Sequence, residues 1–319
     1  MINQTSFGIA FKANQLIKID NTYDVNNLKK FSIDDIFVVG ECTNTIFNES
    51  IDKIILKSNF NDLVFDGVNI KVGANINWHE FVMTCNKNNL YGLENLAYIP
   101  GSVGASPIQN IGAYGVEVSK FIHSVECIDL DTLKIVTLDH HECKFAYRES
   151  IFQSKKYLIN TINFVLEDKF KPVLKYESLN NYMKINNLKE NEMTSAKLIE
   201  IIGSIRSSRL PNPSIIPNCG SFFKNPVLKT QDINNIDKLF IIENIEDELV
   251  KISAGSILEV IEDKINFYGN ISLHQSNKLV LVNSNNCTFR DLKRTVKSIQ
   301  DIVLDEFNIS LQVEPILIE

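Results

Sequence analysis

The sequence predicts an α+β protein with more than one domain. Strand-like apolar runs at 121–138 and 157–166 follow one another, which differs from the strict alternation of a βαβ protein. Residues 289–307 carry apolar side chains on one face of a helix, with short strand-like runs on either side. A chain of 319 residues, of which 44% are hydrophobic, can form two or three small domains with a sizeable core.

Short strands around a helix are expected over residues 1–50. The run IFVVGECTN is apolar up to Gly40 and polar beyond it, which predicts a strand that ends in a tight loop. Residues 77–90 carry apolar side chains at helical spacing, and Asn77 is placed to cap that helix. We therefore expect a strand, a tight loop and a helix, in this order, ahead of residue 92.

The chain changes character again beyond residue 166. Residues 168–194 are polar and irregular, and a helix is expected over about 194–208. Three prolines in SSRLPNPSIIPN break that helix, so we expect a domain boundary there. Beyond it, the 289–307 helix alternates with short strands such as LVLVN and SLQVEPILI.

Composition excludes several classes of protein. The net charge of -7, without a basic stripe, argues against nucleic-acid binding. The 6 cysteines form no CxxC pair and no tight cluster, which is typical of reduced cytoplasmic thiols rather than of disulfides or a zinc site. The N-terminus lacks the pattern of a secretory signal, and no apolar run reaches transmembrane length. We expect a cytoplasmic protein without a membrane partner.

The segment 92–115, GLENLAYIPGSVGASPIQNIGAYG, holds five glycines and two prolines with almost no charge. Glycine and proline both break helices, so an ordered loop is expected. Because glycine has no Cβ, the backbone of such a loop can approach a flat or anionic ligand, and successive N–H groups can bind an anion. A dinucleotide cofactor fits this description, and a buried glycine-rich crossover in a β-rich domain fits it equally well.

The common nucleotide-binding motifs GxGxxG and GxxxxGK[ST] do not occur. The loop GECTN at 40–44 follows a strand and can hold a pyrophosphate through its N–H groups and the side chains of Thr43 and Asn44. A simple hairpin or helix-entry turn is the alternative. His140 and His141 are adjacent and would point to opposite faces of a strand, so we expect no metal site.

Two charged residues are candidates for chemistry. Arg148 follows Tyr147 in FAYRES, a pairing suited to bidentate capture of a carboxylate or phosphate. The alternative is a surface arginine paired with Glu149. Glu314 follows the alternating run SLQV and is expected at the end of a buried strand, where a carboxyl group can act as an acid or orient a charged partner. A solvent-exposed carboxylate is the alternative there.

The segment GSFFKNP sets Ser221, Lys224 and Asn225 around two aromatic residues. A serine here can donate a proton if a neighbour eases its loss. No GxSxG motif surrounds Ser221, so nucleophilic hydrolysis is not expected. The alternative is a strand that buries Phe222 or Phe223 and gives Ser221 no special role.

Taken together, these segments resemble the UDP-N-acetylenolpyruvoylglucosamine reductase family almost from end to end. The matching pieces occur in the family's order: TSFGI, VVGECTN, GLENLAYIPGSVGASPIQNIGAYG, CKFAYRESIF, RSSRLPNP, NCGSFFKNP and VEP. The glycine-rich block and GSFFKNP are long and specific. FAYRESIF at 145–152 and KYESL at 175–179 are similar to the YRxSxF motif and the tyrosine-bearing segment of the family's long form.

The resemblance implies a two-subdomain FAD-binding module of the vanillyl-alcohol-oxidase (PCMH) type and a C-terminal α+β substrate domain. It places the FAD-binding subdomains at 1–52 and 53–203 and the substrate domain at 204–311, with the tail 312–319 near the first subdomain. It implies that NADPH reduces non-covalently bound FAD, which reduces a UDP-sugar with an enolpyruvyl ether to UDP-N-acetylmuramate for peptidoglycan synthesis. We expect a monomer.

The same resemblance implies roles for individual residues. Arg148 would stabilise charge on the substrate carboxylate, Glu314 would support it, and Ser221 would protonate the carbanion-like carbon with help from Lys224. The sugar nucleotide would be contacted by Tyr147, Tyr176, Arg209, Lys224 and Asn225. The cofactor would be contacted by Gly40, Glu41, Cys42, Thr43, Asn44, Gly101, Ser102, Gly104, Ala105, Ser106, Ile108 and Gly112.

Three residues depart from the family pattern. Cys42 and Thr43 stand where the phosphate loop usually has glycine and serine, and a positive φ at Cys42 would weaken FAD binding. Ser256 stands where an aromatic residue is common. Two other interpretations stay open: a flavin- or nucleotide-binding relic without catalysis, and another flavin oxidoreductase of the same fold. Many such oxidases hold FAD covalently through His or Cys, and segment 92–115 contains neither.

Overall fold

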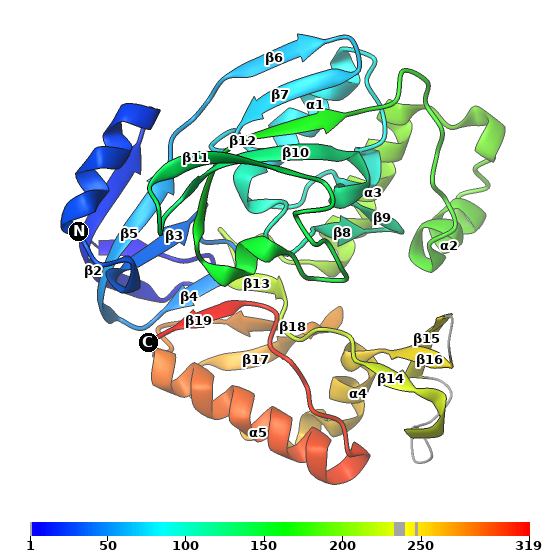
Figure 1. The fold of residues 1–319 in the computed structure, drawn as a ribbon. Coiled ribbons are helices and arrows are strands. Elements are labelled where there is room, and N and C mark those ends of the chain that lie inside the picture. Colours follow the sequence, from blue (N-terminus) through cyan, green and yellow to red (C-terminus); the bar gives the residue numbers. More distant parts are fainter. Residues whose placement is uncertain (1, 233–239, 246–247) are drawn as a thin grey trace. The chain divides into compact units, whose positions relative to one another are not determined.

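The computed structural model describes residues 2–232, 240–245 and 248–319, so residues 233–239 and 246–247 of the expected substrate domain lie outside the described residues (Figure 1). The chain forms two compact units, and each is described by itself. Unit 1 contains Ala13–Glu41 and Asp52–Arg206, and unit 2 contains Ile2–Lys12, Cys42–Ile51 and Ser207–Glu319. In the described ranges, no helix has the length and apolar character needed to span a bilayer.

Unit 1 is built on an antiparallel sheet in the order β11-β10-β12-β7-β6 (Figure 1). The expected strand runs form β10, β11 and β12. The pairing of β10 with β12 is interrupted at Asn160, because Glu126 faces Thr161 while Cys127 faces Ile159. Asn160 is therefore the extra residue of a β-bulge. The strands are β6 Leu63–Asp66, β7 Asn69–Gly73, β10 Ile122–Asp129, β11 Lys134–Asp139 and β12 Tyr157–Val165.

Helix α1 (Trp78–Lys87) confirms the helix expected over 77–90. The side-chain oxygen of Asn77 accepts a hydrogen bond of 3.1 Å from the Glu80 N–H, which caps the helix as the sequence predicted. The buried face of α1 sets Trp78 and Phe81 against Phe164 of β12. This cluster of aromatic rings is the centre of the unit 1 core.

Two more helices belong to the same core. α3 (Ser195–Arg209) confirms the helix expected over about 194–208 and buries Leu198 and Ile202. α2 (Glu177–Ile185) lies in the segment expected to be irregular, so that expectation is wrong. The helix forms because Leu179 and Met183, four residues apart, are both buried against the core and anchor one face.

A smaller sheet in the order β1-β2-β5-β3 contains the strand expected before Gly40. Its strands are β1 Ile2–Gln4, β2 Ala10–Ile19, β3 Ile36–Val39 and β5 Ser50–Ser58. β3 and β5 are parallel, with Val39 opposite Lys57. Because parallel strands end at the same edge of a sheet, the loop that starts at Gly40 begins beside the last residues of β5.

Unit 2 packs α4 (Ala254–Ile261) and α5 (Phe289–Phe307) against the sheet β13-β18-β17. α5 is the expected 289–307 helix. It begins with a capping box in which Thr288 and Asp291 exchange hydrogen bonds. Val296 and Ile299 of α5 join the α4 residue Ile257 in the unit 2 core. The strands of this sheet are β13 Asn218–Ser221, β17 Ile271–His274 and β18 Asn277–Asn283.

Two small sheets complete unit 2. One has the order β14-β16-β15, with β14 Val227–Lys229, β15 Ile241–Ile245 and β16 Leu249–Ile252. In the other, β19 (Ile316–Ile318) runs parallel to β4 (Thr45–Phe47). The run SLQV forms a single bridge, Phe223↔Val313, so the buried strand expected before Glu314 is wrong. Pro315 has no N–H to continue such a ladder.

Candidate active site

A narrow cleft in unit 1 is lined by both glycine-containing loops. The GECTN loop contributes Gly40, and the segment 92–115 contributes Ser102, Gly104, Ala105 and Ile108. Its cavity volume of about 30 Å3 is small, so unit 1 provides a wall of small residues rather than an enclosed pocket. The remaining lining residues are Val38, Val39, Lys57, Ser58, Ala74, Tyr157, Leu158 and Ile159.

The segment 92–115 is an ordered loop that α1 holds in place. The Trp78 indole N–H donates to the Leu96 carbonyl at 2.8 Å, and the Trp78 backbone N–H donates to the Gly101 carbonyl at 3.0 Å. Gly101 has a φ of 122°, a conformation that side chains rarely adopt. Leu96 and Val103 are fully buried. The segment is therefore both a packed crossover and the wall of the cleft.

Gly104 shows why this wall needs small residues. Its N–H donates to the Ala74 carbonyl at 2.8 Å, and a Cβ on Gly104 would lie 2.5 Å from the Ala74 Cβ. At Gly40, a Cβ would lie 3.1 Å from the Ser102 Oγ. The two loops therefore approach each other so closely that their backbones form the cleft surface.

Polar atoms without partners are buried beside the cleft. Among the described residues, Ser58 Oγ, Ser106 Oγ and both side-chain polar atoms of Asn160 make no hydrogen bond. Ser58 lines the cleft, and Asn160 follows Ile159, which also lines it. Buried polar groups in proteins almost always have partners. These unsatisfied atoms lie behind the cleft surface, and the small residues of the wall leave room in front of it for a flat ligand.

Arg148 lies beside the C-terminal end of the glycine-rich segment. Its Nη2 donates to the Gly112 carbonyl at 3.0 Å, and its guanidinium carbon lies 5.2 Å from the centre of the Tyr147 ring. Ser150, in the same motif, donates from its Oγ to the Ile108 carbonyl at 2.7 Å. The FAYRES motif is thus fastened to the cleft wall at Ile108 and Gly112.

Tyr176 is also part of unit 1. It precedes α2 and is 44% exposed, and its ring meets that of Tyr114 edge to face with centroids 5.6 Å apart. Tyr114 belongs to the glycine-rich segment and has a φ of 49°. An exposed phenol that is held in this way can contact a ligand outside the core.

Ser221 and Glu314 are brought together in unit 2. The backbone N–H of Glu314 donates to the Phe222 carbonyl at 2.9 Å, and the N–H of Lys224 donates to the Gln312 carbonyl at 2.9 Å. Phe222 and Phe223 are fully buried, as the alternative interpretation of this strand expected, whereas Ser221 remains partly exposed. The two phenylalanines anchor the strand and leave Ser221 accessible.

The second half of the GECTN loop contacts Ser6, near the N-terminus, and Glu314. Ser6 donates from its N–H to the Cys42 carbonyl at 3.2 Å and from its Oγ to the Thr43 carbonyl at 3.0 Å. The Asn44 side chain donates to the Glu314 carbonyl at 3.5 Å. Cys42 has a φ of 52°, so this departure from the family pattern occupies the left-handed region that favours glycine.

Three other residues that the sequence singled out lie at helix ends or contact them. Arg209 is the exposed last residue of α3. The Asn225 Oδ1 accepts a hydrogen bond of 3.0 Å from the Ala254 N–H and so holds the first turn of α4. Ser256 donates to the Ser253 Oγ at 2.8 Å. Ser256 therefore serves the cap of α4 rather than a flat packing surface.

Sequence reasoning did not find Lys57, Ser58, Asn160 or the buried Glu94. Burial raises the pKa of the Glu94 carboxyl, which accepts hydrogen bonds from the Gly92 N–H at 2.8 Å and from Ser195 at 3.2 Å. Lys57 and Ser58 end the strand IILKS, and their role depends on its parallel pairing with β3. No local sequence pattern predicts the parallel pairing of β5 with β3.

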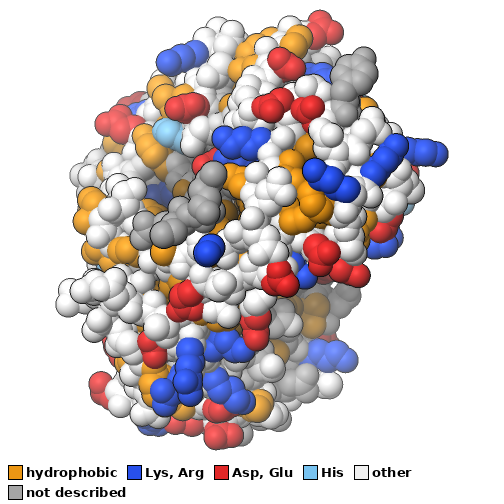
Figure 2. All heavy atoms as spheres, turned by 90° about the vertical axis from the view of Figure 1, so that its left-hand side faces the viewer, with side chains coloured by type: hydrophobic (Ala, Val, Ile, Leu, Met, Phe, Trp, Pro, Cys, Tyr) orange, Lys and Arg blue, Asp and Glu red, His pale blue; other side chains and the backbone are white. Residues whose placement is uncertain are grey.

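Other clusters of the described residues offer no comparable site. No group of three His, Cys, Asp or Glu side chains is arranged to bind a metal in the described ranges. An open hollow of about 720 Å3 runs along α5 in unit 2, but its walls mix four basic with three acidic side chains. Figure 2 shows the same mixture, with Lys and Arg side chains beside Asp and Glu across the face drawn.

Comparison with known proteins identifies both parts of the chain. Residues 19–139 match the FAD binding domain family, and residues 211–318 match the family described as UDP-N-acetylenolpyruvoylglucosamine reductase, C-terminal domain. The chain is 35% identical to the UDP-N-acetylenolpyruvoylglucosamine reductase of Neisseria gonorrhoeae, covering 97% of this chain and 93% of that protein. It is also 35% identical to the same reductase of Pseudoalteromonas translucida, covering 98% and 93%.

A solved structure of a UDP-N-acetylenolpyruvylglucosamine reductase from Thermus caldophilus has the same fold. It superposes with a TM-score of 0.69 at 16% identity, over 100% of this chain and 99% of that chain. The expected fold class, an α+β FAD-binding module with a C-terminal α+β domain, is thereby confirmed.

An FAD-binding domain whose cleft is walled by glycine-rich loops, followed by a reductase C-terminal domain, defines a flavin-dependent oxidoreductase. Identity of 35% along nearly the whole length is specific to one such family. The chain belongs to the UDP-N-acetylenolpyruvoylglucosamine reductase family.

Proposed function

We propose that the chain catalyses the NADPH-dependent reduction of UDP-N-acetyl-3-O-(1-carboxyvinyl)-glucosamine to UDP-N-acetylmuramate, a step of peptidoglycan precursor synthesis. The observation that carries this proposal is the 35% identity to the reductase of Neisseria gonorrhoeae along 97% of the chain. NADPH as the reductant, a cytoplasmic location and a monomeric state are parts of the proposal. So is the division into FAD-binding subdomains at 1–52 and 53–203 and a substrate domain at 204–311.

Bound FAD would supply the hydride, taken from NADPH and given to the methylene carbon of the enolpyruvyl group. In the protein, the proposed cofactor contacts are the two glycine-containing loops. Glu41, Cys42, Thr43 and Asn44 offer backbone N–H groups or short polar side chains to the diphosphate. The flat part of the cofactor would lie against Gly40, Gly101, Ser102, Gly104, Ala105, Ser106, Ile108 and Gly112.

Hydride addition leaves negative charge on the carboxylate of the substrate. Arg148 is the residue proposed to stabilise it, because a guanidinium offers a fixed pair of donors to a carboxylate. Its hydrogen bond of 3.0 Å to the Gly112 carbonyl limits where the guanidinium can point. A preorganised donor at developing charge is worth about 3–4 kcal/mol in the transition state.

Ser221 is proposed to give a proton to the carbon next to the carboxylate. A hydroxyl is a poor acid, so a nearby cation such as Lys224 would ease the loss of its proton. The Glu314 carboxyl group, in its protonated form, is proposed to support the carboxylate of the substrate by donating a hydrogen bond or a proton. Ser221, Lys224 and Glu314 come from two segments that are hydrogen-bonded to each other in unit 2, which supports their joint role.

Five residues are proposed to contact the sugar nucleotide. Arg209 suits the diphosphate because its charge is permanent and its donors are several. Tyr147 and Tyr176 offer phenol groups, and Lys224 and Asn225 offer donors for the remaining oxygens. The exposed position of Tyr176 and Arg209 supports this assignment.

A second candidate function is a relic that binds a flavin or nucleotide without turnover. The positive φ of Cys42 favours it, because the cofactor loop then carries backbone strain. The presence of Arg148, Ser221 and Glu314 favours the reductase. The other oxidoreductases of this fold that bind FAD covalently are disfavoured, since segment 92–115 has no His or Cys.

The experiment is steady-state turnover by the purified, FAD-loaded protein. NADPH oxidation should require the enolpyruvyl sugar nucleotide, and mass spectrometry should find UDP-N-acetylmuramate, with a smaller kcat/KM for NADH. NADPH oxidation that is independent of the sugar nucleotide would point to another oxidoreductase. Bound flavin with no NADPH oxidation at all would point to the relic.

A further inference from the structure

We propose that Lys57 binds the diphosphate of FAD and that the Glu41 carboxylate holds its ammonium group at the entrance of the cleft. The starting observation is the register of β3 and β5, which sets Lys57 opposite Val39 and therefore beside Gly40. Lys57 and Gly40 line the same cleft. Both residues lie at the carboxyl ends of this parallel pair of strands.

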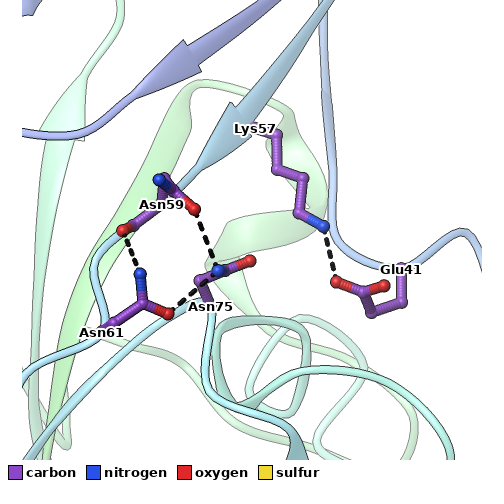
Figure 3. Close-up of polar contacts among 5 residues, drawn as sticks. All are labelled: Glu41, Lys57, Asn59, Asn61 and Asn75. Carbon is purple, nitrogen blue, oxygen red and sulfur yellow. Dashed lines mark hydrogen bonds and ion pairs between the residues drawn. The ribbon is translucent and has the colours of Figure 1, made fainter.

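The negative charges of Glu41 and of a bound diphosphate would be balanced by a cation at this edge of the sheet. Glu41 belongs to the GECTN loop, and a diphosphate would bring two further negative charges to that loop. Lys57 Nζ lies 2.5 Å from Glu41 Oε1, and the two side chains are 22% and 44% exposed (Figure 3). Among the described residues that line the cleft, Lys57 is the one with a positive charge. The same ammonium group can therefore bridge the carboxylate and a phosphate oxygen.

The chain beyond Lys57 is rigidly held. The Asn75 amide nitrogen donates to Asn59 Oδ1 at 3.0 Å and to Asn61 Oδ1 at 2.9 Å, and the Asn61 amide nitrogen donates to the Asn59 carbonyl at 2.6 Å (Figure 3). These bonds join the end of β5 to the residue that follows Ala74, a lining residue of the cleft. These hydrogen bonds therefore hold the backbone at the end of β5, from which the Lys57 side chain extends.

The test measures FAD dissociation constants by quenching of flavin fluorescence, without turnover. It therefore does not depend on the proposed roles of Arg148, Ser221 and Glu314. Lys57→Gln should weaken FAD binding by about 10- to 100-fold, the usual value of a charge-assisted hydrogen bond. Lys57→Arg, which keeps the charge, should stay within about threefold of the parent. Lys71→Gln is the control, since Lys71 pairs with Glu126 at 3.6 Å away from the cleft.

The double variant Lys57→Gln/Glu41→Gln distinguishes two roles of Lys57. In one, Lys57 binds the diphosphate; in the other, it only forms an ion pair with Glu41. If Lys57 binds the diphosphate, the double variant should bind FAD at least about tenfold more weakly than Glu41→Gln alone. If Lys57 only neutralises Glu41, the double variant will bind FAD as Glu41→Gln does, and the proposal is overturned. Unchanged binding by Lys57→Gln would overturn it as well.

Discussion

The backbone N–H of Glu314 donates a hydrogen bond of 2.9 Å to the carbonyl of Phe222, the residue next to Ser221. The neighbouring bridge Phe223↔Val313 continues this antiparallel pairing. Because Phe222 and Phe223 are fully buried, the two segments form one rigid piece. The proposed proton donor Ser221 and the supporting carboxyl group of Glu314 are thus separated by a single backbone pairing, although they are 93 positions apart in the sequence.

Replacing Glu314 with Gln should slow the reduction of the sugar nucleotide and leave the fold intact. The backbone hydrogen bond to Phe222 does not use the side chain, so stability should change little. We expect reoxidation of the flavin by the sugar nucleotide to slow by about 100- to 1,000-fold in a stopped-flow measurement, because the Gln amide can donate a hydrogen bond but cannot supply a proton as a carboxyl group can. Glu319→Gln, at an exposed carboxylate of unit 2, is the control. A parental rate for Glu314→Gln would remove Glu314 from the mechanism.

Replacing Cys42 with Gly should stabilise the protein and tighten FAD binding. Cys42 has a φ of 52°, and a side chain in this region costs about 1–2 kcal/mol, part of which the entropy of glycine offsets. We expect the free energy of unfolding in urea to rise by about 0.5–1 kcal/mol. Cys42→Ala keeps the Cβ and should give no such gain. Equal gains in both variants would assign the effect to the thiol instead of the backbone.

Replacing Asn160 with Val should stabilise the FAD-free protein. The side chain of Asn160 is fully buried, and its two polar atoms have no partner. Removing an unsatisfied buried amide should raise the free energy of unfolding by about 1–3 kcal/mol. The control is Asn163→Val on the same strand, which breaks a hydrogen bond of 2.9 Å to Ser124 and should destabilise. Similar losses in both variants would mean that the Asn160 amide is satisfied in solution.

The Glu94 carboxyl should make stability fall as the pH rises. Burial raises the pKa of Glu94 from its ordinary value of 4.5, so the folded state binds the proton more tightly than the unfolded state. The resulting stability is present below pH 4.5 and is lost as the pH rises through the folded pKa. Urea unfolding from about pH 4 to about pH 8 should therefore show a decline in the parent that Glu94→Gln lacks. Glu190→Gln, at an exposed site, should keep the decline. Parallel curves for the parent and Glu94→Gln would contradict the raised pKa.

The parts of the fold that were predictable carry local signals. α1 was expected because Asn77 stands as a cap directly before apolar residues at helical spacing, and α5 was expected because residues 289–307 carry apolar side chains on one face. α2 was missed because its buried residues are few and the polar residues around them dominate the pattern. The bulge at Asn160 has no local signal either, since it exists only through the register that β12 adopts with β10.

The candidate site divides in the same way. Both glycine-containing loops were predicted from their glycines and prolines, and the structure shows a close approach at Gly40 and no room for a Cβ at Gly104. The position of Lys57 depends on the parallel pairing of β5 with β3, and strands that are distant in sequence give no local sign of their pairing. The sequence alone did not determine the φ of Cys42, and the structure shows that it is positive, at 52°.

The central claim is that the chain passes a hydride through FAD to the enolpyruvyl sugar nucleotide and that Ser221 provides the proton. The most direct measurement is anaerobic stopped-flow absorbance of the flavin in the parent and in Ser221→Ala, with each half-reaction followed separately. NADPH should bleach the flavin of both proteins at similar rates, and the sugar nucleotide should restore the absorbance rapidly only in the parent. A parent whose bleached flavin is not reoxidised by the sugar nucleotide, or a Ser221→Ala variant that loses both half-reactions equally, would contradict this claim.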